Sequence, residues 1–208
     1  AGELGQVYYG RASMIRRRSV PTIHFPSTGI MGRGDWFLNA EKAGGGALMD
    51  IGVHAYDLMW WFMGSPKPVA VSASTYRMIY EDEAARAGVQ FDVDELASAM
   101  VRYGNGATAF VDVSWAAHQE PEWNVRVFGS KAGIMLKPPT VFRDRGGILE
   151  STQVEVPEME RISPQRHFVD CIRDPEKPLI SSGEEALQVV RVLDAIRRSA
   201  AAREEVRV

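Results

Sequence analysis

Three ionisable side chains, Asp50, His54 and Asp57, stand in an otherwise apolar stretch that follows the glycine triplet 44–46. If this stretch is a helix with about 100° per residue, the three fall within roughly 60° of one face. A helix that is apolar nearly all round is normally buried, and ionisable groups on it are costly unless they are paired or face a polar cavity. The spacing therefore indicates one wall of an active site.

These residue types can transfer a proton. Histidine is the side chain type that commonly exchanges a proton near neutral pH, so His54 is a candidate to take a proton from a substrate hydroxyl and return it later. Asp50 lies one turn earlier, where it can orient the imidazole and stabilise its charged form. The helix dipole also favours a carboxylate in the first turn. The glycine triplet lets a ligand or another backbone approach the helix entrance closely. We therefore predict His54 and Asp50 as catalytic residues.

Two other interpretations of the same residues stay open at this point. One is a buried structural His–Asp pair where a helix meets a sheet. The other is a metal site of the form D-x3-H-x2-D, because histidine and carboxylates are common metal ligands. No fourth ligand is indicated nearby, and we predict no metal.

The complete motif G-G-G-x-L-x-D-x-G-x-H-x-x-D-L at 44–58 resembles the substrate-domain signature of the Gfo/Idh/MocA family of NAD(P)-dependent oxidoreductases. That family includes glucose–fructose oxidoreductase and inositol dehydrogenase. Similar elements span nearly the whole chain, at 2–7, 17–21, 34–37, 61–68, 124–133 and 163–208.

The resemblance implies an enzyme that oxidises a secondary alcohol of a sugar or polyol, with NAD or NADP as cofactor. In that reaction His54 would be the general base and Asp50 would tune it. The alternative is a non-catalytic oligomerisation or ligand-binding module of the same fold.

Family members begin with a dinucleotide-binding domain, which this chain lacks. No G-x-G-x-x-G fingerprint occurs in the 208 residues, and the E-K-P motif that holds the family's catalytic lysine is absent as well. We therefore interpret 1–208 as a single substrate-binding and oligomerisation domain. Its partner would be the N-terminal Rossmann domain of a parent enzyme, which would bind most of the cofactor. We expect the isolated chain to be inactive.

Arg17, Trp36 and Asp57 are the predicted substrate-binding residues. An aromatic ring can stack on a sugar's apolar face, and an arginine can hydrogen-bond hydroxyls or a cofactor phosphate. Arg17 and Trp36 could equally brace their loop against the sheet. We expect Asp57 to anchor the helix or loop beside the site rather than to react. The remaining histidines, at 24, 118 and 167, are interpreted as loop or structural residues.

Composition restricts the class of protein. The chain is 45% hydrophobic and 25% charged, which suits one well-cored globular domain. The net charge of −3 gives no electrostatic case for a nucleic-acid partner. The single cysteine, Cys171, excludes an internal disulfide and suits a reducing cytoplasm. The apolar segment 47–63 carries three ionisable groups, so we predict no membrane span.

Short-range signals predict most of the helices and strands. Asn105-Gly106 predicts a hairpin, and Ser163-Pro164 begins a helix that must end before Pro175. Ser182 and Glu185 form a capping box for a helix that reaches about residue 202. We expect a loop at 17–35, an exposed excursion at 81–95, and strands at 5–15, 69–80, 95–103, 107–116, 123–129, 133–137, 140–145 and 148–156.

These elements add up to an α+β fold, in which one large, mainly antiparallel sheet has helices packed on one face. The second face of such a sheet is free. The resemblance implies that this open face joins subunits into a homodimer or homotetramer, and the alternative is an ordinary solvated face.

Overall fold

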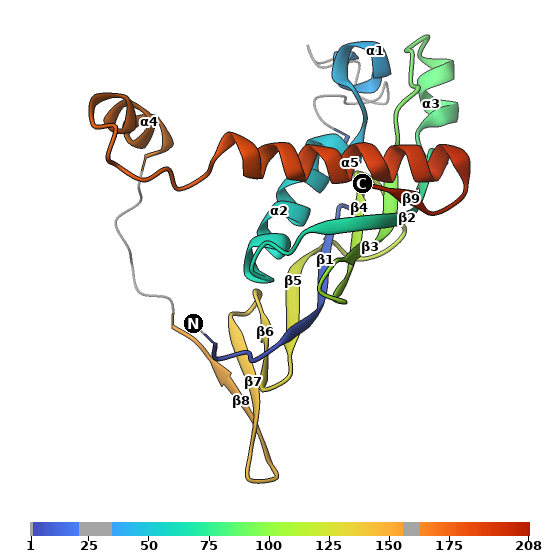
Figure 1. Cartoon of the computed structure of the whole chain (residues 1–208). Helices are drawn as coiled ribbons and strands as arrows, with labels where there is room; N and C mark the ends of the chain where they lie inside the picture. Colours follow the sequence, from blue (N-terminus) through green and yellow to red (C-terminus); the bar gives the residue numbers. More distant parts are fainter. Residues whose placement is uncertain (1, 21–34, 156–162) are drawn as a thin grey trace.

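A single sheet runs through the molecule (Figure 1), and the computed structural model describes residues 2–20, 35–155 and 163–208. Its strands are β1 (Val7–Ile15), β2 (Pro68–Tyr76), β3 (Leu96–Tyr103), β4 (Thr108–Ser114), β5 (Glu122–Gly129), β6 (Ala132–Met135), β7 (Thr140–Arg145), β8 (Ile148–Gln153) and β9 (Val206–Arg207). Their spatial order is β8-β7-β6-β5-β1-β4-β3-β2-β9. The β1–β4 pair is parallel and the other pairs are antiparallel. The predicted α+β class is confirmed.

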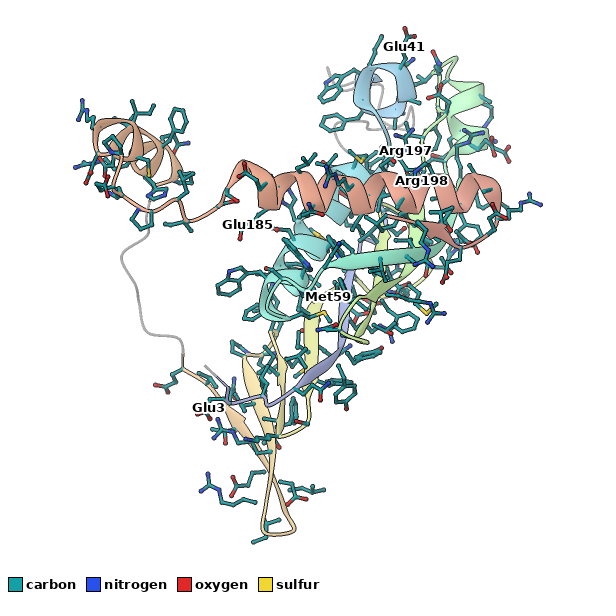
Figure 2. All side chains as sticks on the ribbon, in the orientation of Figure 1. Glu3, Glu41, Met59, Glu185, Arg197 and Arg198 are labelled. Atoms are coloured by element: carbon teal, nitrogen blue, oxygen red, sulfur yellow. The ribbon has the colours of Figure 1, made fainter. Side chains whose placement is uncertain are left out.

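Two helices pack on one face of this sheet. α2 (Val53–Phe62) continues from a π-helical turn, η2 (Leu48–Gly52), and lies against β1 and β5, while α5 (Gly183–Ala202) lies across β2. Met59 points from α2 toward the strands in Figure 2. A Cβ at Gly10 of β1 would lie 3.1 Å from Met59 and 2.4 Å from Met63, so the missing side chain lets α2 approach the sheet.

The hairpin and the helix caps agree with the sequence signals. Asn105 accepts a bond from the backbone N–H of Ala107, and Gly106 has φ +84° in the turn between β3 and β4. α4 (Pro164–Arg173) begins after the N-cap Ser163. The capping box of Ser182 and Glu185 starts α5. The first residues of α5, including Leu187, are exposed and project from the sheet, whereas Val189, Val192, Leu193 and Ile196 further along are buried.

The segment 81–95 differs from the exposed excursion expected for it. It contains the short helix α3 (Glu81–Arg86), and Ala84, Phe91 and Val93 are buried. The expected strand 69–80 also ends early, at Tyr76. The reason is the buried Glu95, whose carboxylate accepts bonds from the three successive backbone N–H groups of residues 78–80 and turns the chain away from the sheet.

Two further short helices, η1 (Asp35–Leu38) and α1 (Ala40–Ala43), precede the glycine triplet. Of the loop expected at 17–35, residues 21–34 lie outside the described residues. Arg18 forms a bridge with Ala116 just after β1. Within the described ranges no helix combines the length and the apolar character needed to cross a membrane.

The other face of the sheet carries an aromatic cluster. The Tyr9 ring lies 5.0 Å from Phe128 and 5.7 Å from Phe110, measured between ring centroids, and both phenylalanines are partly exposed. Beside them Asp112 pairs with Arg11 and accepts a bond from Ser98. This face therefore offers both apolar and charged contact groups to a partner.

Candidate active site

The glycine triplet at 44–46 packs against the backbone at Asp94. The Asp94 carboxylate accepts bonds from the backbone N–H groups of Gly46 at 2.9 Å and Leu48 at 2.8 Å. The Asp94 carbonyl accepts a third from Ala47, also at 2.9 Å. A Cβ at Gly46 would lie 1.9 Å from that carbonyl oxygen, so only glycine fits. These N–H groups are therefore occupied and do not form a cradle for a cofactor phosphate.

The turn that follows is wider than an α-helical turn. The N–H of Val53 bonds the carbonyl of Leu48, five residues back, and this π-helical turn carries Asp50. Such turns occur often at functional sites. Because each residue in a wide turn rotates the chain less than the 100° assumed from sequence, the arc between Asp50 and His54 differs from that of an ideal α-helix.

Asp50 is held by the ends of two strands. Its Oδ2 accepts a bond of 2.9 Å from the indole Nε1 of Trp115, which is fully buried just after β4. The guanidinium of Arg16, which follows β1, lies 4.0 Å from the same oxygen. Arg16 also donates its backbone N–H to the carbonyl of Ser114. The half-buried carboxylate thus accepts a bond from a neutral donor and lies near a cation.

His54 lies one turn further along, on the exposed side of α2. No hydrogen bond joins it to Asp50 in the described part of the chain, where the partners of Asp50 are Trp115 and Arg16. Asp57 follows His54 by three residues on the same helix and is also exposed. Desolvation raises the pKa of the Asp57 carboxyl, Glu185 raises it further, and His54 opposes both. The exposure of His54 disagrees with a buried structural His–Asp pair.

The other predicted site residues lie apart from this anchor. Arg17 pairs with Glu120 at 3.4 Å, with both side chains largely exposed. Trp36 is partly exposed and stacks on Phe37. His118 contacts Arg18, whereas His24 lies outside the described residues. Among the residues that the structure describes, no group of three or more His, Cys, Asp or Glu side chains could hold a metal ion.

Sequence reasoning missed Arg16, Trp115 and Asp94. Arg16 belongs to the basic run 16–18, but only the register of β1 against β4 shows which arginine reaches Asp50. Trp115 directly follows β4, and its indole N–H was the available signal, because a buried indole normally finds an acceptor. Asp94 lies 46 residues from Leu48, and no local pattern joins the two.

The chain belongs to the Gfo/Idh/MocA family, because the family model for the GFO/IDH/MocA C-terminal domain matches residues 1–135. It is 26% identical to D-glucoside 3-dehydrogenase of Escherichia coli K12 over 209 residues, which cover 96% of this chain and 56% of that enzyme. The chain therefore spans about half the length of this relative.

Solved structures share the fold. The NAD complex of GenD2 from gentamicin A biosynthesis is 26% identical, with a TM-score of 0.69, 99% of this chain covered and 56% of that one. Levoglucosan dehydrogenase in complex with NADH and levoglucosan has a TM-score of 0.77 at 22% identity, with 100% of this chain covered and 60% of that one. The second similarity concerns the fold alone.

Proposed function

We propose that this chain is the substrate-binding and catalytic-base part of an NAD(P)-dependent oxidoreductase that acts on a secondary alcohol of a sugar or polyol. The observation that carries the proposal is the anchored carboxylate of Asp50 on the same helical segment as the exposed His54. Membership of an oxidoreductase family and the identity of 26% to a D-glucoside dehydrogenase support the substrate class.

His54 accepts the proton of the substrate hydroxyl as the carbinol carbon is oxidised, and returns it in the reverse direction. Its exposure leaves the imidazole accessible to a bound substrate. Asp50 orients the substrate and contributes negative charge near the developing imidazolium, without a direct bond to it. Arg16, beside Asp50, has guanidinium N–H groups suited to a sugar hydroxyl.

Arg17, Trp36 and Asp57 stay in the proposal as substrate-side residues. The exposed Trp36 ring offers a stacking face. Asp57, whose pKa is raised by desolvation, lies on the same helix as His54 and anchors the helix beside the site. Because Arg17 pairs with Glu120 at the surface, its contact with substrate would require that pair to open.

The cofactor in this proposal is NAD or NADP, held mainly by an N-terminal nucleotide-binding domain. The GenD2 complex with NAD supports a cofactor of this type. A nicotinamide supplies the acceptor for the hydride of the carbinol carbon. The glycine-rich turn of this chain does not offer its N–H groups at residues 46 and 48 to a cofactor, since the Asp94 carboxylate accepts bonds from them. Their part is to bind the alcohol and to move its proton.

We also propose a cytoplasmic homodimer or homotetramer formed through the open face of the sheet. The cluster of Tyr9, Phe110 and Phe128 supplies apolar contact area there. That cluster equally favours the second candidate function, a non-catalytic oligomerisation module. Such a module predicts a stable oligomer whose melting temperature does not change with sugar or cofactor.

The test is an assay of the full-length protein for NAD(P)H formation with a panel of sugars, glycosides and cyclitols. We expect turnover with at least one of them, and none from the 208-residue chain alone. A full-length protein that binds NAD(P) yet oxidises no polyhydroxy alcohol would contradict the proposal and favour the module.

A further inference from the structure

We propose that Asp94 is a positioning residue, which sets the separation between Asp50 and Trp115 and thereby the placement of the catalytic carboxylate. This inference rests on the proposed function. Asp94 contacts neither Asp50 nor His54 through a hydrogen bond in the described structure. It acts through the helical turn that carries Asp50.

The first step is the attachment of that turn. The Asp94 carboxylate and carbonyl together bond three successive N–H groups, those of residues 46–48, at 2.8–2.9 Å. The first N–H groups of a helix have no partner within the helix, and a carboxylate is favoured there by the helix dipole. Asp50 follows two residues after the last of these N–H groups, so its backbone position depends on where Asp94 holds the turn.

The second step is the attachment of Trp115. The backbone N–H of Trp115 donates to the carbonyl of Glu95 at 2.9 Å. Glu95 is the neighbour of Asp94, is buried, and is itself fixed by the N–H groups of residues 78–80. The dipeptide Asp94-Glu95 therefore holds both the turn that bears Asp50 and the strand end that bears Trp115.

The bond of 2.9 Å from the Trp115 indole to Asp50 Oδ2 closes this ring of contacts. The segments that bear the Asp50 carboxylate and the Trp115 indole are both bonded to Asp94 and Glu95, so these two residues set the separation of the two groups. Gly46 is required for these contacts, because any side chain at this position would separate the turn from Asp94.

Asp92 provides a matched control two residues away. Its carboxylate accepts the backbone N–H of Ala40 at 2.6 Å, at the start of the short helix α1. Asp92→Ala therefore removes the same charge and the same kind of helix-end bond as Asp94→Ala, but at a helix that does not carry Asp50. A general effect of losing a helix-end carboxylate appears in both variants.

The experiment follows the ¹⁵N–¹H signal of the Trp115 indole in the 208-residue chain, assigned with Trp115→Phe, and kcat and KM in the full-length protein. We expect Asp94→Ala to move the indole signal and to lower kcat about 10- to 100-fold, the scale of a misplaced catalytic group. KM should change by a smaller factor because Asp94 does not touch the substrate. Asp92→Ala should leave signal and kcat unchanged.

A folded Asp94→Ala protein whose indole signal stays at the wild-type position, or whose kcat does, overturns the inference. If Asp94→Ala does not fold, Asp94→Asn takes its place. It keeps one acceptor oxygen and should move the signal in the same direction by less, and an unmoved signal overturns the inference as well. If the full-length protein shows no dehydrogenase activity, the proposed function fails. The indole signal then still decides whether Asp94 positions Asp50.

Discussion

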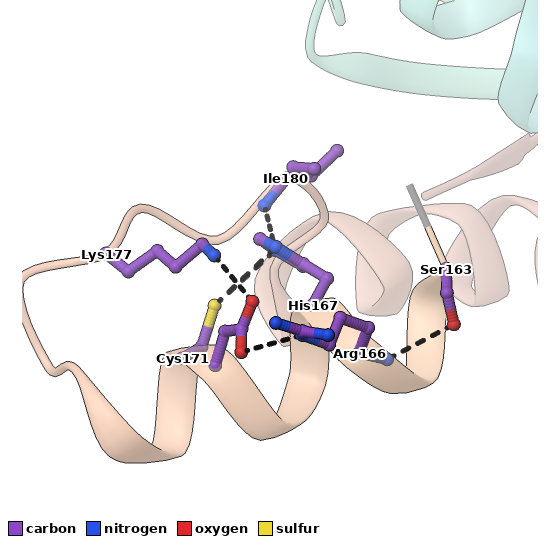
Figure 3. A network of polar contacts seen from close by, with 7 residues as sticks. Ser163, Arg166, His167, Cys171, Lys177 and Ile180 are labelled. Atoms are coloured by element: carbon purple, nitrogen blue, oxygen red, sulfur yellow. Dashed lines mark hydrogen bonds and ion pairs between the residues drawn. The ribbon is translucent and has the colours of Figure 1, made fainter. Parts of the chain in front are cut away.

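The start of the helical segment at Asp50 and the helix α4 differ in where the partners of their polar side chains lie in the sequence. Asp50 is fixed by residues far away in the sequence, Trp115 and Arg16, while Asp94 holds its turn. α4 is held by its own neighbourhood. Arg166 and Lys177 pair with Asp170, and His167 contacts Cys171 and the N–H of Ile180 (Figure 3).

This difference has consequences for energy and for function. In Figure 1, α4 stands apart from the sheet, and its apolar residues Phe168 and Ile172 are exposed. A change in α4 should therefore stay local, whereas a change at the entrance of α2 should alter both the core and the candidate site. The following predictions test that contrast, beginning with the largest expected effect.

Leu193→Ala and Leu187→Ala compare the packed and projecting parts of α5. Leu193 is fully buried and Leu187 is 47% exposed. We expect Leu193→Ala to lower the free energy of unfolding by about 2–5 kcal/mol, because it leaves a cavity in the core. Leu187→Ala should change it by about 0.5 kcal/mol or less. Urea unfolding measures both, and equal losses would show that the projecting part is packed too.

Trp115→Phe should cost about 1–3 kcal/mol of unfolding free energy, because it leaves Asp50 Oδ2 without its indole donor. Trp61→Phe is the control, since Trp61 is 64% exposed and shares the same helix segment as His54. Its effect should stay within about 0.5 kcal/mol. Denaturant unfolding at neutral pH compares the two, and similar losses would argue against the buried anchor.

A pH effect confined to α4 should be the smallest. The hydrogen bond from Lys177 lowers the pKa of the Asp170 carboxyl, and Arg166 adds to the shift. Because the folded-state pKa lies below the ordinary value of about 3.9, the stabilisation is complete above that value. This stabilisation is lost as the pH falls through the lowered pKa of Asp170 in the folded state.

Hydrogen exchange of α4 amides, compared between wild type and Asp170→Asn at each pH, measures this effect. We expect slower exchange in the wild type at neutral pH and convergence of the two proteins in acid. Exchange in α2 should not differ between them. A difference that also appears in α2 would mean that α4 is coupled to the sheet.

Features that depend on adjacent residues could be predicted from the sequence. The hairpin at Asn105-Gly106, the N-cap Ser163 and the capping box of Ser182 and Glu185 each form from residues two to four apart. The alternation of β4 is also local, since the apolar Ala109, Val111 and Val113 occupy every second position of the strand and are buried.

Features that depend on tertiary contacts could not be predicted. The π-helical turn breaks the assumed 100° spacing between Asp50 and His54. The start of that turn is bonded by Asp94, which lies in a loop 46 residues further along the chain. Whether Arg16 or Arg17 lies beside the Asp50 carboxylate depends on the register of β1 against β4. The segment 81–95 contains many acids, but its buried Glu95 satisfies three backbone N–H groups that composition does not reveal.

The most direct test of the central claim is the turnover of His54→Ala in the full-length protein, with His167→Ala as control. His167 lies in α4, where its contacts are local. We expect His54→Ala to lower kcat about 100- to 10,000-fold at neutral pH, the usual contribution of a general base. His167→Ala should keep wild-type turnover. Unchanged turnover in His54→Ala would contradict the role assigned to the polar face of α2.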